Sequence, residues 1–319
     1  MQLNSYKTQF ITSLLTVVDE AEAQSFFYMV TEHVHQLRRI DLALNPTFQI
    51  TEVQLQQWES IRHRLLMHEP IQYILGSTIF CDLPFEVTPD VLIPRPETEE
   101  LVAWVMESFR FIPQSLYQSA HASSQVSSFR FQVSSFKDSL YQTHHLPPTT
   151  YFPKFLDIGT GSGCIAIALA KNLPEVQVSA LDVSEEALEI ARLNANQNGV
   201  SINFINQNIL ETSKLDQQFD VIVSNPPYVR ELEKHEILPN VLEHEPHLAL
   251  FVADEDPLLF YRKIGELAFE SLTPNGHLFV EINQYLGEAT LQLFREIGFT
   301  EVELRKDLYG NDRMIRASR

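Results

Sequence analysis

The feature that constrains the fold most is an apolar strand candidate, Lys154–Ile158, that runs directly into the glycine-rich loop 159–163. Small and apolar residues follow at 164–170 and predict a helix. A strand, a glycine loop and a helix in this order let the backbone approach a ligand closely, with helix N–H groups pointing at it. Cys164 stands where a dinucleotide-binding fingerprint requires glycine, which argues against a dehydrogenase. The candidate ligand-binding residues of this loop are Gly159, Thr160, Gly161, Ser162 and Gly163.

From residue 154 onward, strand and helix patterns alternate, which predicts right-handed βαβ units around a parallel sheet. The last two strand candidates are joined by residues 307–311 and are expected to form a hairpin that adds an antiparallel strand. Ligands of such sheets bind beyond the carboxyl ends of the strands, near the topological switch point. The strand candidates are 154–158, 176–181, 202–206, 219–224, 277–282, 299–304 and 313–317.

Polar side chains follow the second and third strand candidates at this same edge. Asp182 stands at the distance where an acidic residue reaches the hydroxyls of a bound ribose. Ser184 is a candidate N-cap for the next helix, with Glu185 and Glu186 in its first turn. Asn208 follows the third strand candidate. Glycine loops and capping acids are common separately, but this combination indicates a nucleoside ligand.

The tetrapeptide Asn225-Pro226-Pro227-Tyr228 comes directly after the apolar strand candidate 219–224. Proline holds the preceding residue extended, so the side-chain amide of Asn225 is expected to point out of the sheet. The Asn225 oxygen and a neighbouring backbone carbonyl can accept both hydrogens of a substrate –NH2 group. Tyr228 offers a face on which a planar group can stack. For an Asn-Pro pair alone, an ordinary strand-ending turn is the alternative.

Taken together, residues 157–163, Asp182 and residues 225–228 resemble class I S-adenosylmethionine-dependent methyltransferases that act on a planar –NH2 nitrogen. Residues 70–76 and 93–99 resemble the segments that join the two domains of the HemK/PrmC family. The members of that family are the glutamine methyltransferases of peptide-chain release factors. Further segments similar to the family are 245–246, 249–250, 281–282 and 307–313. The resemblance covers nearly the whole chain apart from one insertion.

The resemblance implies an α/β fold of the Rossmann-like class I type, with a seven-stranded sheet and a small N-terminal helical domain. It implies a transferase that uses S-adenosyl-L-methionine to methylate the side-chain amide nitrogen of the glutamine in the Gly-Gly-Gln motif of release factors. The cofactor would lie over the glycine loop, with its ribose on Asp182, and would also meet Asn225. Adenine contacts are expected at Asn208 and Ile209, although Asn208 stands where an acidic residue is common in the family.

An amide nitrogen is a poor nucleophile because its lone pair is delocalised into the carbonyl, so the enzyme must position it against the sulfonium methyl group. We expect the Asn225 oxygen and the Pro226 carbonyl to accept the two N–H groups, while Tyr228 packs on the amide plane. Acceptors placed in advance then stabilise the positive charge that develops on nitrogen, and no general base is needed before transfer. The expected catalytic residues are Asn225, Pro226 and Tyr228, and Pro227 joins them in binding the substrate.

The chain divides into three expected parts. They are a helical bundle at 1–75, a β-hairpin linker at 76–96 and a methyltransferase domain at 97–319. In the bundle, Thr51 begins a candidate capping box. The resemblance implies that this bundle helps to grip the release factor. Arg95 and Glu97 are expected either to border the cofactor entrance or to brace the two domains.

An insertion at 111–153 departs from the family pattern. Residues 125–131 nearly repeat as 132–138, amid many Ser, Gln and His residues. One repeat pair without Leu or Ile seams is too short for a coiled coil, so we expect a flexible, low-complexity segment. Its phenylalanines leave open a sticky segment that docks on the protein or pairs with itself. The pair His144-His145 is interpreted as loop composition and not as a metal site.

A formal net charge of −19 argues against a protein that neutralises many phosphates, so no direct contact with nucleic acid is expected. Cys81 and Cys164 have no metal-ligand spacing, so we expect neither a metal site nor a disulfide framework. No apolar run approaches membrane-spanning length, and the N-terminus lacks a signal-peptide pattern. We therefore expect a cytoplasmic protein without a membrane partner, acting as a monomer.

Two other functions remain open. An adenine-amino methyltransferase acting on nucleic acid suits the same tetrapeptide, but it would be expected to carry a basic target-recognition segment. A non-catalytic protein that binds release factors would keep the fold without turnover. The glycine loop, Asp182 and Asn225 argue against the second alternative, whereas failure to bind the cofactor would support it.

Overall fold

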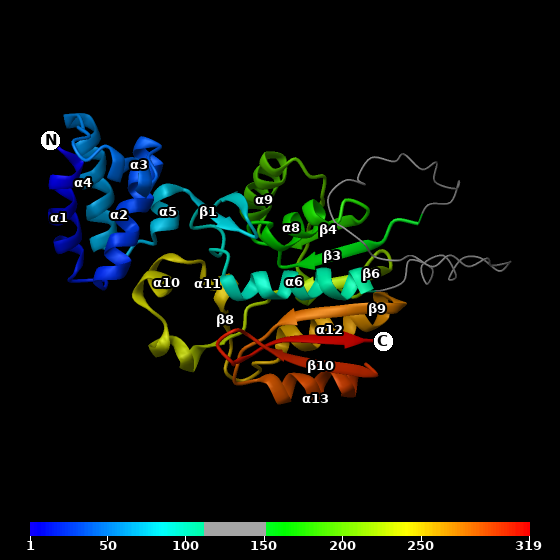
Figure 1. Ribbon diagram of the computed structural model, residues 1–319. Helices are drawn as coiled ribbons and strands as arrows, with labels where there is room; N and C mark the ends of the chain where they lie inside the picture. Colours follow the sequence, from blue (N-terminus) through cyan, green and yellow to red (C-terminus); the bar gives the residue numbers. More distant parts are fainter. Residues whose placement is uncertain (112–150) are drawn as a thin grey trace, which may run out of the picture.

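The computed structural model describes residues 1–111 and 151–319 (Figure 1). Nearly all of the insertion expected at 111–153, with its repeat and its histidine pair, therefore lies outside the described residues. Along the described chain, a group of N-terminal helices leads through a β-hairpin into an α/β unit. None of the helices in these two ranges is both long and apolar enough to cross a membrane.

The α/β unit is built on the seven-stranded sheet that the sequence predicts. Its strands are β3 (Lys154–Ile158), β4 (Gln177–Asp182), β5 (Asn203–Asn206), β6 (Phe219–Ser224), β9 (Leu272–Glu281), β10 (Glu301–Lys306) and β11 (Asp312–Ser318). They lie in the order β10-β11-β9-β6-β3-β4-β5. The strands from β5 to β9 in this order pair in parallel, and β11 pairs antiparallel with both β9 and β10. The predicted C-terminal hairpin is thus confirmed.

Strand boundaries agree with the predicted ones within two residues, except at the start of β9. That strand begins at Leu272, five residues before the expected residue 277. Leu272 pairs with Phe219, and the register then shifts before Val221 pairs with His277. The intervening Thr-Pro-Asn-Gly sequence has the composition of a turn, which is why the sequence pattern does not show this part of the strand.

The order of the strands creates the expected binding edge. The chain moves outward from β3 to β4 and β5, and then returns to the other side of β3 as β6. This reversal sets the topological switch point at the carboxyl ends of β3, β4 and β6. The segments that follow these three strands are the glycine loop, Asp182 with its neighbours, and the tetrapeptide at 225–228.

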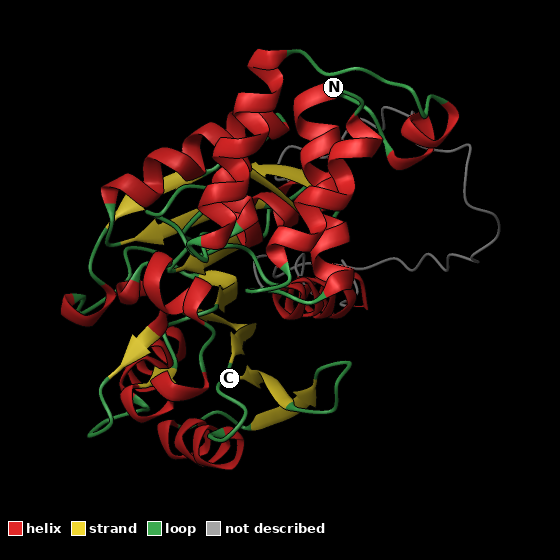
Figure 2. Ribbon diagram, turned by 90° about the vertical axis from the view of Figure 1, so that its left-hand side faces the viewer, coloured by secondary structure: helices red, strands yellow, loops and turns green. Residues whose placement is uncertain are grey.

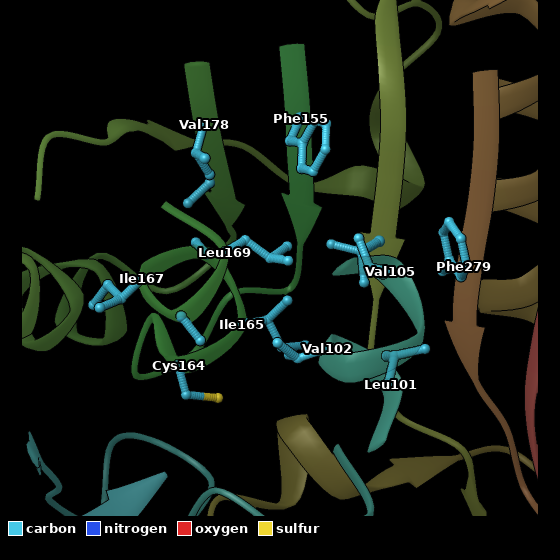
Figure 3. Close-up of a cluster of buried hydrophobic side chains, with 14 of the residues drawn as sticks. Leu101, Val102, Val105, Phe155, Cys164, Ile165, Ile167, Leu169, Val178 and Phe279 are labelled. Carbon is cyan, nitrogen blue, oxygen red and sulfur yellow. The ribbon is translucent and has the colours of Figure 1, made fainter. Parts of the chain in front are cut away.

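Helices cover both faces of the sheet. One layer consists of α6 (Pro96–Phe111), α8 (Cys164–Asn172) and α9 (Glu185–Asn198), and the other of α12 (Leu259–Ser271) and α13 (Gly287–Ile297). Successive residues of β3 enter different cores, since Phe155 packs in the first layer and Leu156 in the second. Figure 3 shows the first core, where Val105 of α6 and Leu169 of α8 lie close to Phe155. Burial on both faces explains the continuous apolar runs of the strands.

The N-terminal helices have an aromatic core of their own. They are α1 (Leu3–Leu14), α2 (Glu20–His35), α3 (Arg39–Leu44), α4 (Glu52–Leu66) and α5 (Ile71–Leu75), and they lie in front of the sheet in Figure 2. Trp58 is fully buried and meets Phe10 edge-on, with ring centroids 5.2 Å apart. At the start of α4, Thr51 and Gln54 exchange hydrogen bonds, which confirms the predicted capping box.

The predicted hairpin between the helices and the sheet is confirmed as β1 (Ser77–Phe80) and β2 (Leu83–Glu86), paired antiparallel. Asn194 of α9 fastens it to the α/β unit: its Oδ1 accepts the Glu86 N–H at 2.6 Å, and its Nδ2 donates to the Glu86 carbonyl at 3.0 Å. The same Nδ2 donates to the carbonyl of Ser162 at 2.9 Å. One buried amide therefore joins the hairpin to the glycine loop.

The segment between β6 and α12 has structure that the sequence patterns did not predict. It contains β7 (Val229–Arg230), the 3₁₀ helix η2 (Glu231–Glu236), α10 (Pro239–His244), α11 (His247–Leu250) and β8 (Phe251–Val252). The two short strands pair in parallel. Buried Glu245 forms an ion pair with Arg95 at 2.6 Å and accepts the Ile93 N–H at 3.3 Å. These contacts hold the segment against the end of the linker.

Candidate active site

A cavity of about 410 Å³ opens at the carboxyl ends of β3, β4 and β6, a size suited to a cofactor or small-molecule ligand. The predicted residues in its wall are Gly159, Thr160, Gly161, Ser162, Asp182, Asn208, Ile209, Asn225, Pro226 and Pro227. Tyr228 borders a smaller hollow of about 40 Å³, which shares Asn225, Pro226 and Arg95 with the main cavity. Three separate sequence signals therefore meet at one site.

Gly163 differs from the other glycines of the loop in its surroundings. Its neighbours Ser162 and Cys164 line the cavity and Gly163 itself does not, so its expected part in holding the cofactor stays a prediction. Its φ is +82°, and a Cβ atom there would lie 2.9 Å from Ile167 Cδ1 and 3.1 Å from the Cβ of Ala191. Glycine at this position therefore permits the close approach of α8 and α9.

The glycine loop is held from below by Asp157, which is fully buried. Its Oδ2 accepts a hydrogen bond from Thr160 Oγ1 at 2.6 Å and another from the Ala166 N–H at 3.2 Å. Burial raises the pKa of this carboxyl to about 7, against the effect of the two hydrogen bonds. Within the described residues, Ser162 Oγ is buried without a hydrogen-bond partner. A free hydroxyl in the wall suits a polar ligand that would satisfy it.

Asp182, at the end of β4, joins this strand to the glycine loop through its side chain. Its Oδ2 accepts the Gly161 N–H at 2.8 Å and its Oδ1 accepts the Ser184 N–H at 3.0 Å. Burial raises the pKa of Asp182, while these backbone donors oppose the rise. Each carboxylate oxygen can accept more than one hydrogen bond, so both remain able to bind hydroxyls from the cavity. The predicted N-cap is confirmed, because Ser184 Oγ accepts the Ala187 N–H at 3.0 Å.

The residues after the third strand are held by a local cap. The Oδ1 atom of Asn208 accepts the Leu210 N–H at 3.0 Å, which caps the short 3₁₀ helix η1 (Ile209–Glu211). Ile209 is buried and presents an apolar wall to the cavity. The predicted adenine contacts at these positions stay predictions, with the Asn208 oxygen already engaged by the backbone.

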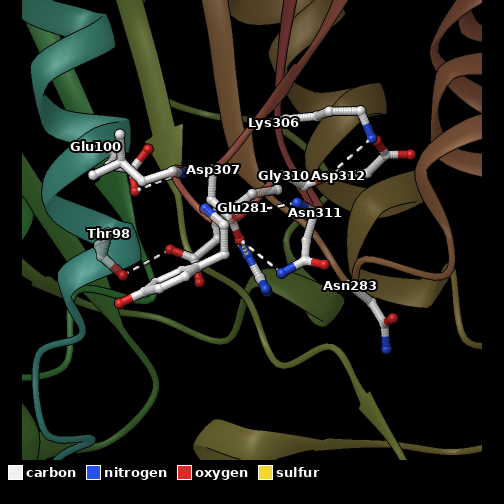
Figure 4. Close-up of polar contacts among 12 residues, drawn as sticks. Thr98, Glu100, Glu281, Asn283, Lys306, Asp307, Gly310, Asn311 and Asp312 are labelled. Carbon is white, nitrogen blue, oxygen red and sulfur yellow. Dashed lines mark hydrogen bonds and ion pairs between the residues drawn. The ribbon is translucent and has the colours of Figure 1, made fainter.

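The residues that follow β6 are held by side chains from distant parts of the chain. Two of these, Thr98 and Glu281, are seen in contact in Figure 4. Asn225 Nδ2 donates to Thr98 Oγ1 at 3.1 Å, and Thr98 Oγ1 donates to Glu281 Oε2 at 2.7 Å. The Tyr228 hydroxyl donates to the other oxygen, Glu281 Oε1, at 2.9 Å. Tyr228 is thus anchored through its hydroxyl, and the proposed stacking on its ring stays a prediction.

The buried carboxyl group of Glu281 in this network lies within the electrostatic influence of a cation, Arg313. Burial raises the pKa of Glu281, while hydrogen bonds from Thr98 and Tyr228 and the charge of Arg313 oppose the rise. Arg313 is itself held by Asp307, whose Oδ2 lies 3.1 Å from Arg313 Nε. The turn between β10 and β11 therefore supports the site through charge.

Thr98 and Glu281 were absent from the predicted site residues. A signal was present, because Glu281 ends an apolar strand, and an acid inside such a run needs a buried partner. The sequence could not name that partner, since Thr98 lies 183 positions earlier. Arg95 was expected either to border the entrance or to brace domains, and it does line the cavity while pairing with Glu245.

Comparison with known proteins identifies the family. The family model of the PrmC N-terminal domain matches residues 7–76, and that of the methyltransferase small domain matches residues 140–248. The release factor glutamine methyltransferase of Flavobacterium psychrophilum is 50% identical, over 100% of this chain and 99% of its own length. This chain belongs to the release factor glutamine methyltransferase family. The resemblance to the HemK/PrmC family is thereby confirmed.

Other release factor glutamine methyltransferases support the assignment. The protein of that name from Bacteroides thetaiotaomicron is 37% identical over 96% of both chains, and the one from Streptococcus pneumoniae is 35% identical over 99% of this chain and 98% of its own. Among solved structures, the catalytic domain of hMettl16 has a TM-score of 0.50 at 15% identity, covering 78% of this chain and 81% of that chain. That likeness shows the fold alone. The predicted class I methyltransferase fold is confirmed.

Proposed function

We propose that this enzyme transfers the methyl group of S-adenosylmethionine to the side-chain amide nitrogen of the glutamine in the Gly-Gly-Gln motif of peptide-chain release factors. The observation that carries the proposal is the position of Asn225, at the boundary between the ligand-sized cavity and the smaller hollow. An amide-recognising group between two such spaces suits a reaction between a cofactor and an amide substrate. Family membership agrees with this reaction.

The residues at the carboxyl ends of β3, β4 and β5 fit the cofactor. The positive φ of Gly159 and Gly161 brings the backbone close to the cavity without side chains in the way. Asp182 offers acceptors to ribose hydroxyls, Ser162 offers a free hydroxyl, and Ile209 offers an apolar surface to the adenine. When bound, S-adenosylmethionine supplies an electrophilic methyl group on a sulfonium sulfur.

The residues on the second side fit the acceptor. The Asn225 oxygen and the Pro226 carbonyl would accept the two N–H groups of the glutamine amide, with Pro227 and Tyr228 against its plane. These acceptors favour the transition state, because the nitrogen becomes positive as the new bond forms. They also hold the nitrogen in one orientation, which replaces a diffusional encounter by a fixed approach. The proton leaves after transfer, when the nitrogen has become acidic.

The proposed division of labour follows the three parts of the chain. The N-terminal helices at 1–75 would grip the release factor, the hairpin linker at 76–96 would set their distance from the site, and the rest would carry out transfer. The proposed enzyme acts as a monomer in the cytoplasm, where release factors work. Its proposed contact is with the protein substrate and not with nucleic acid, in keeping with the net charge of −19.

The direct test is methyl transfer to a folded release factor. The wild-type protein, Asn225→Ala and the matched control Asn275→Ala, which changes an exposed asparagine, are incubated with S-adenosylmethionine and the release factor. Peptide mass spectrometry then locates any added methyl group. We expect it on the Gly-Gly-Gln glutamine with the wild type and the control, and not with Asn225→Ala. Methylation of adenine in an oligonucleotide instead, or no transfer despite measured cofactor binding, would overturn the proposal.

A further inference from the structure

Thr98, in the first turn of α6, lies between Asn225 and the buried carboxylate of Glu281. Figure 4 shows its contact with Glu281. The residue is only 2% exposed. Its Oγ1 accepts the hydrogen bond from Asn225 Nδ2 at 3.1 Å and donates to Glu281 Oε2 at 2.7 Å. Residues from α6, from β9 and from the segment that follows β6 thus form one chain of hydrogen bonds that ends at the cavity.

The direction of this chain is set by the number of protons available. Thr98 Oγ1 donates to Glu281 Oε2, so its single hydroxyl proton is used in that bond. Thr98 Oγ1 can then only accept from Asn225, which must turn its NH2 group toward it. The two ends of a carboxamide are nearly alike in size, so packing alone does not choose between them. Among the described residues, Asn225 Oδ1 forms no hydrogen bond, and the side chain lines the cavity.

This orientation decides whether Asn225 can receive an amide substrate. With its oxygen toward the cavity, the side chain accepts an N–H group; with the carboxamide turned over, its own N–H groups would face those of the substrate. We propose that Thr98 and Glu281 are positioning residues that hold the Asn225 carboxamide with its oxygen toward the glutamine amide. The proposal rests on the proposed function, because it takes that amide as the acceptor.

Glu281 is a suitable reference point because it is fixed at both oxygens. Thr98 donates to Oε2, and the Tyr228 hydroxyl donates to Oε1 at 2.9 Å. Burial raises the pKa of Glu281, the charge of Arg313 opposes this rise, and Asp307 holds Arg313 in place. The same carboxylate therefore orients Asn225 through Thr98 and Tyr228 directly, so both move together if it moves.

Two substitutions at Thr98 test the role of its hydroxyl. Thr98→Val keeps the shape and removes the hydroxyl, whereas Thr98→Ser keeps the hydroxyl. The matched control is Thr290→Val in α13, which removes the hydroxyl of another buried threonine, one that donates to the Leu286 carbonyl at 2.9 Å. Each variant is assayed with S-adenosylmethionine and a release factor, well below its own unfolding temperature.

We expect Thr98→Val to lower kcat by roughly tenfold to a hundredfold. The lower bound corresponds to the loss of one buried hydrogen bond, and the upper bound to the loss of one contact made in the transition state. The Kd for S-adenosylmethionine and the KM for the release factor should change by less than about threefold, since uniform binding is untouched. Thr98→Ser should restore kcat to within about threefold, and Thr290→Val should keep it. A wild-type kcat in Thr98→Val, or equal loss in Thr98→Ser, would overturn the proposal.

A second measurement needs no acceptor and so separates this proposal from the proposed function. With ¹⁵N-labelled asparagine, the Asn225 NH2 signals are identified by their absence in Asn225→Ala, and their hydrogen exchange with water is measured. Exchange should be slowed in the wild type and Thr98→Ser, and fast in Thr98→Val. It should also be fast in Glu281→Gln, because the glutamine NH2 group can donate to Thr98, which can then donate to the oxygen of Asn225 and leave the Asn225 NH2 group unbonded. If no variant methylates a release factor, these rates still decide the orientation. Equal rates in the wild type and Thr98→Val would overturn it.

Discussion

The two sides of the cavity are built by different means. On the cofactor side, which comprises the glycine loop and Asp182, the contacts join residues that are close in the sequence. Thr160 bonds to Asp157 three positions away, and the Gly161 N–H bonds to Asp182 twenty-one positions away. On the acceptor side, Asn225 bonds to a residue 127 positions away, and Thr98 to one 183 positions away. The first side uses mainly backbone N–H donors, and the second uses side chains from three elements.

The two sides therefore need different parts of the fold to be in place before their contacts can form. The glycine loop can form its contacts once β3, α8 and the neighbouring strand β4 exist. The acceptor side requires α6, β6 and β9 to be assembled before Asn225 has a partner. We therefore expect changes on the cofactor side to act through local backbone geometry, and changes on the acceptor side to act through coupled side chains.

The largest expected effect is that of Asn225→Ala. Loss of one preorganised transition-state acceptor should lower the rate of methyl transfer roughly a hundredfold to a thousandfold. The glycine loop and Asp182 are untouched, so the Kd for S-adenosylmethionine should rise by less than about tenfold. Single-turnover kinetics with a release factor and calorimetry with the cofactor measure the two effects. Equal losses of rate and of cofactor affinity would show that the two sides are not separable.

The fold could be predicted from the sequence because each strand is an apolar run buried on both faces. Phe155 and Leu156 enter opposite cores, which makes the run of β3 continuous and easy to find. The early part of β9 was missed because residues 273–276 have the composition of a turn. The short strands of the segment 229–252 were missed as well, since two residues are too few for a periodic pattern.

The candidate site could be predicted only where its residues stand in short motifs. Asp182 and Asn225 each follow an apolar strand, and this position marks them. No sequence motif identifies Thr98, because its role depends on Asn225, which lies beside it only in the folded chain. Gly163 shows the opposite case, in which a residue of the motif allows α8 and α9 to pack closely and does not itself line the cavity.

The next effect concerns Asp157, the buried acid beneath the glycine loop. Its pKa is about 7 in the folded protein and about 4 in an unfolded chain. The folded state therefore keeps a proton that the unfolded state loses between these values, and stability falls as pH rises from about 4 to about 7. In Asp157→Asn this slope should be absent. The free energy of unfolding of the variant, relative to the wild type, should rise by roughly 3 kcal/mol across that interval.

Denaturant unfolding of the cofactor-free protein at several pH values measures this slope. The control is Asp216→Asn, which changes an exposed carboxylate and should leave the pH profile of the wild type unchanged. Parallel profiles for Asp157→Asn and the wild type would contradict the expected burial of a proton on Asp157.

A smaller effect separates two glycines of the same loop. Gly161 and Gly163 both have positive φ, at +53° and +82°, so alanine is strained at either position. At Gly163 the new Cβ also meets Ile167 and Ala191, and we expect a loss of about 2 kcal/mol of stability. At Gly161 the loss should be about 1 kcal/mol, but the residue lines the cavity, so cofactor affinity should fall more than in Gly163→Ala. Thermal unfolding and cofactor titration of both variants check the contrast, and the reverse ranking of affinities would contradict it.

Arg95→Ala is expected to change stability without changing kcat, and it tests whether Arg95 belongs to the acceptor side or braces the linker. Its partner Glu245 is 1% exposed, and the arginine side chain is 31% exposed, so removing the guanidinium leaves a buried carboxylate at a cost discounted to about 1–2 kcal/mol. A bracing role predicts lower stability with an unchanged kcat, and partial recovery of stability when Glu245→Gln is added, because the stranded charge is then gone. A fall in kcat that persists in the double variant, well below its unfolding temperature, would instead assign Arg95 to the acceptor side.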